Sequence, residues 1–424
     1  MHSRYKLSGI QEFTISLTRG DDSSIISPAG IRIKGELNLA KLEKSIQKLV
    51  NESDAMRMVF VRDEETNTIC QEVLDSYHYK LDMRDTPDGT DEQKEEFIRN
   101  DLFGEERRIE YLPDGEVKWF CILYRYRDAD YSLWFVMSHI LADGLSITNA
   151  LTRIVLRYNG IPFPASSSYL EFIKDQYRLE SDPDCIRQRE AVFEGIKDYT
   201  PPADYSQMGQ TESFYREMVT LKIDNLKKFA RANKMSLFHC TLFMFHAAVA
   251  AAYRTNDSLI GVAVNARKLK SMSSIGEFLT GYADRNSFRG DDRMREMAVR
   301  CKERYLAESR KDIAMYDLFR NGTEFILSYQ NYGDISKDIK LGKATARPYE
   351  NIDYFMKPFH WANLSLDAYE AGNELSVCAG FDDIHFDEKM FNRMKNAFIV
   401  ANRALSDEDM TFSEYCKTVD EISE

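Results

Sequence analysis

The stretch "MSHILADGLS", residues 137–146, contains the side chains of this chain that are best suited to chemistry. His139 stands four positions before Asp143, which is followed directly by Gly144. An imidazole with an ordinary pKa of about 6.5 is mostly neutral near neutral pH, so it can accept a proton from an amine or a hydroxyl group that attacks a carbonyl carbon. The pattern therefore predicts a proton acceptor at His139.

Asp143 has two possible roles, and the spacing leaves both open. In the first, it caps a helix that begins near Leu145, while Gly144 provides a permissive turn and His139 is an ordinary loop histidine. In the second, its carboxylate pairs with an arginine of another element and fixes the shape of the histidine loop. The candidate arginines are Arg57, Arg267 and Arg285.

A strand before His139 and a helix after it are needed to position these residues. The runs "VKWFCILYRY" and "YSLWFVMS" are rich in β-formers and are separated by "RDAD", so they predict a hairpin whose second strand ends at the histidine. Beyond Gly144, apolar side chains recur on one helical face until "NGIPFP" ends the helix; these are Ile147, Leu151, Ile154, Val155 and Tyr158.

Both halves of the chain show mixed helix and strand patterns. "AGIRIKGELNLAKLEKSIQKLVNESDAMRMVFVRD" predicts strand, helix and strand. The second half offers the strands "FYREMVTLKI", "LIGVAVNAR", "EFILSYQNYG" and "ELSVCAGFDD", a pair of helices within 225–255 and a closing helix "DEKMFNRMKNAFIVANRAL". A charged, proline-broken stretch over 168–213 is the expected linker. We predict two α/β lobes, residues 1–175 and 176–424.

The composition excludes several classes of function. With 424 residues and 43% apolar residues the chain can form real cores, whereas a net charge of −13 argues against a nucleic-acid partner. The sequence has neither a Gly-rich phosphate loop nor an uninterrupted apolar run long enough to span a membrane. The seven cysteines form no C-x-x-C pair, so we expect no metal site. These features predict a cytoplasmic protein without a membrane partner.

Several motifs, taken in order, resemble the condensation domains of nonribosomal peptide synthetases, within the superfamily of chloramphenicol-acetyltransferase-like acyltransferases. "KLSGIQEF" resembles the opening Leu-Ser-x-x-Gln signature, and "SDAMRMVF" resembles the element that carries an arginine, here Arg57. "MSHILADGLS" resembles the Met-His-His-x-x-x-Asp-Gly-x-Ser core. "SYLEFIKDQY", "LIGVAVNAR", "IGEFLTGYADR" and the segment from "NLSLDAYEAG" through the closing helix resemble later family elements, so the resemblance spans nearly the whole chain.

The resemblance implies a fold and an activity. It implies two acyltransferase-like lobes in a V-shaped pseudo-dimer with a central tunnel, and it assigns His139 as the catalytic residue. His139 would act either as a general base or by a hydrogen bond that stabilises the tetrahedral intermediate. Asp143, Gly144, Arg57 and Arg285 would then be structural residues of the active site. An acyl or aminoacyl thioester would arrive on the phosphopantetheine arm of an acyl or peptidyl carrier protein. The acceptor would be an amine, free or carrier-bound, the product an amide, and no cofactor would be bound.

The chain also departs from the family pattern. Ser138 stands where the first histidine of the core is usual, and Glu52 stands where a further arginine usually begins the element around Arg57. Candidate side chains of the substrate tunnel are Ser138, Asn331, His360 and Trp361.

Two other hypotheses about the function remain. The first is an ester-forming or small-amine acyltransferase of the same superfamily, and the second is a non-catalytic module that binds carriers or recruits another protein. Because the sequence shows neither a carrier nor an adenylation signature, we expect a free-standing enzyme, with an excised piece of a larger protein as the alternative.

Overall fold

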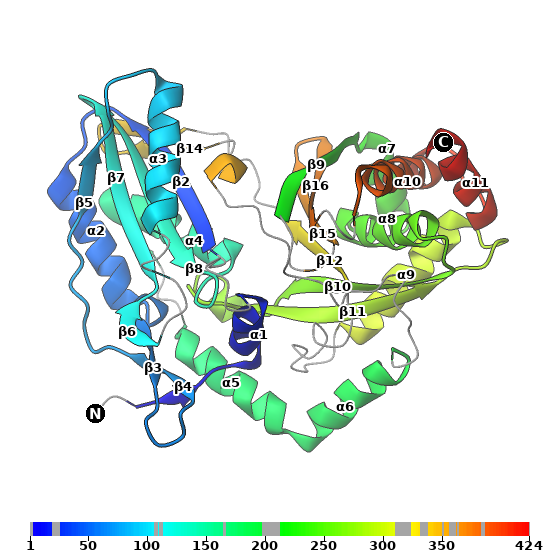
Figure 1. Ribbon diagram of the computed structural model, residues 1–424, viewed down its shortest axis with the longest axis horizontal. Coiled ribbons are helices and arrows are strands. Elements are labelled where there is room, and N and C mark those ends of the chain that lie inside the picture. Colours follow the sequence, from blue (N-terminus) through cyan, green and yellow to red (C-terminus); the bar gives the residue numbers. More distant parts are fainter. Residues whose placement is uncertain are drawn as a thin grey trace. The chain divides into compact units, whose positions relative to one another are not determined.

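A computed structural model describes residues 3–18, 26–105, 109, 113–163, 167–196, 213–309, 324–330, 338–349, 352–355, 362, 364–382 and 386–423. The described chain is a mixed α/β structure that divides into two compact units (Figure 1). Unit 1 comprises Met1–Arg178, Asn265–Leu279 and Ile335–Lys357, and unit 2 comprises Leu179–Val264, Thr280–Asp334 and Pro358–Glu424. The predicted α/β class is confirmed.

Unit 1 contains a six-stranded and a four-stranded sheet. The six-stranded sheet has the order β13-β14-β2-β8-β7-β5, with bounds Ile339–Leu341, Ala344–Pro348, Ile26–Lys34, Asp130–Ser138, Trp119–Arg127 and Asp82–Asp85. The four-stranded sheet has the order β1-β4-β3-β6, with bounds Tyr5–Lys6, Ile69–Val73, Met58–Arg62 and Asp114–Val117. The helices are α1 (Gly9–Thr18), α2 (Leu39–Glu52), α3 (Asp91–Glu105), α4 (Gly144–Tyr158) and α5 (Tyr169–Ser181), with short 3-10 turns at Ala55–Arg57, Leu269–Ser271 and Ile352–Phe355.

Strands β7 and β8 form the predicted antiparallel hairpin at the centre of the larger sheet. Their side chains alternate: one set, which includes Leu123 and Phe135, packs with α2 and α4, and the other set, which includes Ile122 and Trp134, packs with α3. Neither face of β8 is exposed to solvent, so polar residues need not alternate with apolar ones along the strand. For this reason its sequence is a nearly continuous apolar run. The end of β8 is thus a rigid point inside unit 1.

Helix α4 follows the histidine loop, as the apolar pattern predicts. Ile147, Ile154 and Tyr158 lie on its buried face, and its side chains pack with those of α2. The helix ends at Tyr158, and Gly160 just beyond it has a φ of 74°, a left-handed conformation that glycine adopts without strain.

Unit 2 contains a six-stranded sheet of the order β11-β10-β12-β15-β16-β9. These strands are Leu279–Ser287, Asp257–Asn265, Phe325–Gln330, Leu364–Ala371, Glu374–Asp382 and Ser213–Lys222. The helices are α6 (Pro183–Glu194), α7 (Asp224–Ala232), α8 (Leu237–Ala252), α9 (Met294–Glu308), α10 (Glu388–Ser406) and α11 (Phe412–Ser423). Nearly every side chain of α8 is buried, so this helix is the centre of the core of unit 2.

Two boundary predictions need correction. The stretch 168–213 was expected to be a linker, but its described part, residues 168–196, contains α5 and α6, because Tyr169 and Ile173 bury one face of α5 and Pro183 suits the first turn of α6. Residues 197–212 of the expected linker lie outside the described residues. The lobe boundary at residue 175 lies near the first division after Arg178, but segments 265–279 and 335–357, assigned to the second lobe, belong to unit 1. Strand β14 pairs with β2, with Ala346 opposite Ile33. This pairing makes segment 335–357 part of the six-stranded sheet of unit 1.

Among the described residues, no single helix has both the length and the apolar character needed to cross a membrane. Helices α7 and α8 pass that test only as a pair, and they are bent by 104° relative to each other.

Candidate active site

The loop after β8 is held in the core by its own apolar residues. Ile140, Leu141 and Ala142 are each at most 1% exposed, and the Leu141 N–H donates to the Ser138 carbonyl oxygen at 3.0 Å. His139 itself is 8% exposed. A histidine on so short and buried a loop keeps a nearly fixed ring position, which a proton acceptor needs.

Asp143 fulfils both roles that the sequence left open. It is the N-cap of α4, where its Oδ1 accepts the Ser146 N–H at 2.8 Å. The same carboxylate binds the two terminal nitrogens of Arg267 at 2.5 and 2.8 Å and accepts the Phe278 N–H at 3.0 Å. Both charged side chains are at most 3% exposed. A bidentate pair with backbone donors on the remaining positions satisfies a buried carboxylate, so the loop and segment 265–279 are joined at one point.

Of the three candidate arginines, Arg267 is the one that binds Asp143. Arg57 and Arg285, expected as structural residues of the active site, have other partners. Arg57 follows α2 and donates to the carbonyl oxygens of Val50 and Leu74, so its guanidinium is used where α2 ends. Arg285 on β11 pairs with Asp257 on the neighbouring strand β10, with an Nη2–Oδ2 distance of 2.5 Å. Each of these arginines can pair with a carboxylate, so the sequence does not determine which one binds Asp143. The tertiary structure determines it.

The other predicted site residues have mixed positions. Gly144 is the first residue of α4, and Ser138 is the last residue of β8 with 4% of its surface exposed. The Ser138 N–H continues the β7–β8 ladder by donating to the Lys118 carbonyl oxygen at 2.9 Å. Asn331, His360 and Trp361 lie outside the described residues.

Glu277 is a site residue that the sequence reasoning missed. Its Oε2 lies 2.6 Å from Nδ1 of His139, and the two side chains are 1% and 11% exposed. The contact has the distance of an ion pair rather than the full geometry of a hydrogen bond. A lone acid in the apolar run "SIGEFL" was the signal that could have identified it, because such acids are rarely buried without a partner.

The residues on either side of Glu277 are anchored to the start of α4. Gly276 exchanges hydrogen bonds with the Ser146 hydroxyl at 2.6 and 3.0 Å, and the Phe278 N–H donates to Asp143. A Cβ at Gly276 would lie 2.2 Å from the Tyr169 ring, so only glycine allows this close approach. The network that ends the histidine loop therefore also places Glu277 beside the imidazole.

The protonation of His139 and Glu277 is coupled through their contact. Burial disfavours the charged imidazole, but the charge of Glu277 and, more weakly, that of Asp143 outweigh burial, so the pKa of His139 is raised. Burial also raises the pKa of Glu277, although His139 opposes that shift. The pair thus retains one shared proton to higher pH than an isolated histidine does.

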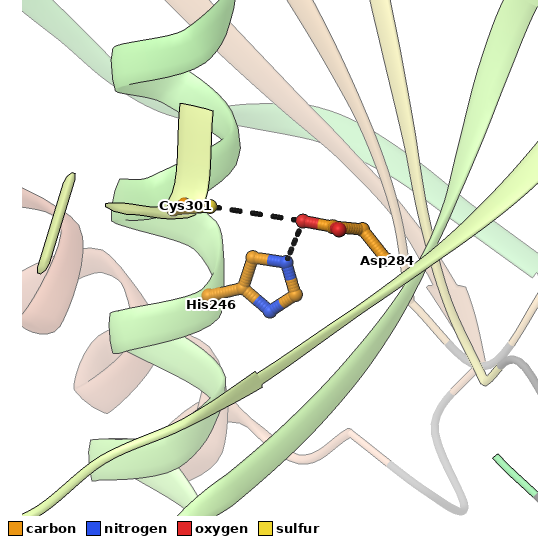
Figure 2. A group of neighbouring side chains, drawn as sticks. All are labelled: His246, Asp284 and Cys301. Atoms are coloured by element: carbon orange, nitrogen blue, oxygen red, sulfur yellow. Dashed lines mark hydrogen bonds and ion pairs between the residues drawn. The ribbon is translucent and has the colours of Figure 1, made fainter. Parts of the chain in front are cut away.

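A second buried polar cluster lies in unit 2, where His246 of α8, Asp284 of β11 and Cys301 of α9 converge (Figure 2). His246 Nε2 lies 3.1 Å from Asp284 Oδ2, and the thiol of Cys301 is 3.7 Å from the same oxygen. Arg304 contacts both oxygens of Asp284, at 3.1 and 2.7 Å, and approaches the Cys301 sulfur at 3.4 Å.

This donor set fits a metal ion poorly. The guanidinium of Arg304 already neutralises Asp284, and His246 Nδ1 is engaged by the Ser258 hydroxyl at 2.7 Å. Burial raises the pKa of Cys301 well above its usual range, which disfavours the thiolate that a metal needs. The cluster is a satisfied internal network that connects β11 to α8 and α9.

We expect Asp284→Asn to lower the free energy of unfolding by about 2 kcal/mol, because it removes the buried negative charge and replaces one of the two oxygens that Arg304 contacts with an NH2 donor. Urea unfolding of the variant and of exposed Asp291→Asn measures the effect. An equal loss in both variants would contradict a structural role for the cluster.

The sequence and the fold were compared with those of known proteins. A family model described as "Condensation domain" matches residues 1–421. Surfactin synthase subunit 1 of Bacillus subtilis (strain 168) is 24% identical over 332 residues, which are 75% of this chain but 9% of that protein. The chain therefore spans about a tenth of the length of that curated relative.

Two solved structures share the fold. The starter condensation domain of rhizomide synthetase RzmA, in complex with C8-CoA and Leu-SNAC, has a TM-score of 0.76 and 14% identity, covering 96% of each chain. The X-domain from teicoplanin biosynthesis, solved as a complex with OxyB, has a TM-score of 0.77 and 14% identity, covering 98% of this chain and 96% of that one.

Proposed function

The chain belongs to the condensation-domain family, and from this premise we propose that it transfers an acyl or aminoacyl group from a carrier-bound thioester to an amine, with His139 at the reaction centre. The observation that supports the proposal is the position of His139, on a short buried loop whose end is tied down by the Asp143–Arg267 pair. Rigid placement of an imidazole beside a reacting carbonyl is what general-base chemistry requires.

The proposed reaction balances without a cofactor. The amine nitrogen attacks the thioester carbonyl carbon, so a C–N bond forms and the C–S bond breaks. His139 takes one proton from the attacking nitrogen and returns it to the departing sulfur, which leaves as a thiol. The products are an amide and the free thiol of the phosphopantetheine arm, and the histidine is unchanged. General-base help of this kind supplies about 10²- to 10⁴-fold, and alignment of the two reactants can supply more.

The proposed roles of Asp143 and Arg267 are structural. The Asp143 carboxylate binds the Arg267 guanidinium and accepts the Phe278 N–H, so both side chains are engaged in the anchor. Gly144 begins α4 directly after this anchor. The loop geometry, rather than a second acid or base at these positions, is their contribution.

A partner that delivers the donor is part of the proposal. The match to a synthetase subunit suggests an acyl or peptidyl carrier protein whose phosphopantetheine arm presents the thioester. The acceptor amine is free or carrier-bound.

A second candidate function is recruitment of another protein without catalysis. It is favoured by the X-domain, which shares this fold and was solved as a complex with OxyB. Ser138, which stands where the family core usually has a histidine, is the feature of this chain in keeping with it. Retention of His139 on an anchored loop favours the catalytic proposal, because a docking surface has no need of a buried imidazole.

Product formation tests the proposal directly. The protein is incubated with C8-CoA or carrier-bound C8 thioester and with Leu-SNAC, other amines or alcohols, and the products are separated by mass. An amide supports the proposed function, an ester supports the hydroxyl-acceptor alternative, and carrier binding without any product supports recruitment. His139→Ala is run in parallel, so that uncatalysed aminolysis of the thioester is subtracted.

A further inference from the structure

The contact between Glu277 and His139 has no role in the proposed function. The pair joins two segments that are distant in the sequence, the loop after β8 and the segment that precedes β11. A buried carboxylate is unfavourable unless a partner compensates it, and the imidazole is the partner that Glu277 contacts at ion-pair distance. A buried carboxylate beside a candidate catalytic histidine therefore needs a physical explanation.

Resting on the proposed function, we infer that Glu277 is a positioning residue: its carboxylate holds His139 by Nδ1 and so directs proton exchange with the substrate to Nε2. A neutral imidazole has one N–H and one lone pair, and the group that binds one ring nitrogen determines which tautomer is present. A carboxylate 2.6 Å from Nδ1 favours the tautomer that carries its N–H on that nitrogen, which leaves the lone pair at Nε2 to accept the proton of the attacking amine.

The carboxylate also stabilises the imidazolium that forms when this proton arrives. The positive charge develops 2.6 Å from Glu277, in a site from which water is largely excluded, so the attraction is stronger than between exposed groups. When the proton passes on to the leaving sulfur, the imidazole returns to its neutral form. Glu277 itself touches no reacting atom in this scheme.

The other charged and titratable groups near the pair are accounted for. Asp143, on the loop side, is neutralised by Arg267. Tyr169 of α5 packs against Gly276, and its hydroxyl has a pKa raised well above the usual range by burial, so it stays protonated. Among the neighbouring charged groups, Glu277 therefore has the largest effect on the charge state of His139.

We expect Glu277→Gln to lower the pKa of His139, since burial then acts on the ring without the opposing carboxylate. The pH at which the rate rises to its plateau falls with it, because the base becomes available at lower pH. On the plateau we expect kcat to fall on the order of tenfold to a hundredfold, part of what general-base catalysis supplies, with little change in KM.

The test pairs an NMR titration with kinetics. The His139 imidazole signals are assigned by their loss in His139→Gln and followed against pH in the wild type, Glu277→Gln, Glu277→Asp and the exposed control Glu36→Gln. Glu277→Asp keeps the negative charge and is expected to restore part of the shift, while Glu36→Gln, with the same change in net charge, leaves it unaltered. Melting curves verify that each variant is folded.

An imidazole pKa that is unchanged in Glu277→Gln would overturn the inference, and so would a shifted pKa with an unchanged kcat. A lowered pKa together with a lowered kcat supports it. The titration needs no substrate, so it decides the His139–Glu277 coupling even if the wild type forms no product. In that event the proposed catalysis fails, and with it the positioning role.

Discussion

We expect His139→Ala to lower the rate of acyl transfer by about 10²- to 10⁴-fold, because the variant lacks the group that takes the proton from the attacking amine. Substrate alignment is retained, so the residual rate should exceed that of the uncatalysed reaction. The measurement is a single-turnover assay of amide formation from the thioester, with thiol release followed in parallel. KM should change less than kcat, since the imidazole acts on the reacting atoms rather than on the remote parts of the substrate.

The matched control is His78→Ala, at an exposed position, which should keep wild-type kcat. Removing His139 also removes the positive charge beside Glu277, so the carboxyl holds a proton in the folded state more strongly. A group whose folded pKa is raised above its unfolded value destabilises the fold as pH rises through that range. His139→Ala should therefore be less stable at high pH than at pH 5, and assays are run where melting curves show it to be folded. Wild-type turnover by the folded variant would refute the role of His139.

Arg267→Met should lower the free energy of unfolding by about 3–5 kcal/mol, which is typical when one partner of a buried ion pair is removed. The remaining Asp143 carboxylate keeps the N–H groups of Ser146 and Phe278 but loses its countercharge at a site that is 3% exposed. Urea unfolding measures the loss. Activity should fall as well, because the same pair joins the histidine loop to the segment carrying Glu277.

Two further variants separate charge from geometry. Arg267→Lys keeps the charge but cannot form the bidentate contact, so an intermediate loss is expected. Adding Asp143→Asn to Arg267→Met removes the unpaired charge and should recover part of the stability. Arg285→Met is the control: its ion pair is about one-third exposed, and such pairs contribute about 0–1 kcal/mol. Equal losses for Arg267→Met and Arg285→Met would contradict the anchoring role of Arg267.

Local patterns were sufficient for much of the fold. The β7–β8 hairpin, α4 and α10 are present where alternation and helical periodicity predict them. These patterns work because a strand or helix exposes one face to the core, and the repeat of that face is recorded in neighbouring residues. The expected linker was wrong over residues 168–196, because a surface helix such as α6, with five charged residues among its twelve, resembles a loop in composition.

The sequence by itself determined which chemical groups are present at the candidate site. They are a histidine at the end of a buried strand and, after it, an aspartate that can both cap a helix and pair with an arginine. It could not determine which arginine, or that an acid would lie against the imidazole. Arg267 is 124 residues from Asp143 along the chain, and Glu277 reaches His139 across a similar distance. Such contacts leave no local periodicity, because they depend on where segment 265–279 packs against α4. Charge attraction allows many pairings, and close packing at Gly276 and Ser146 selects the one that forms.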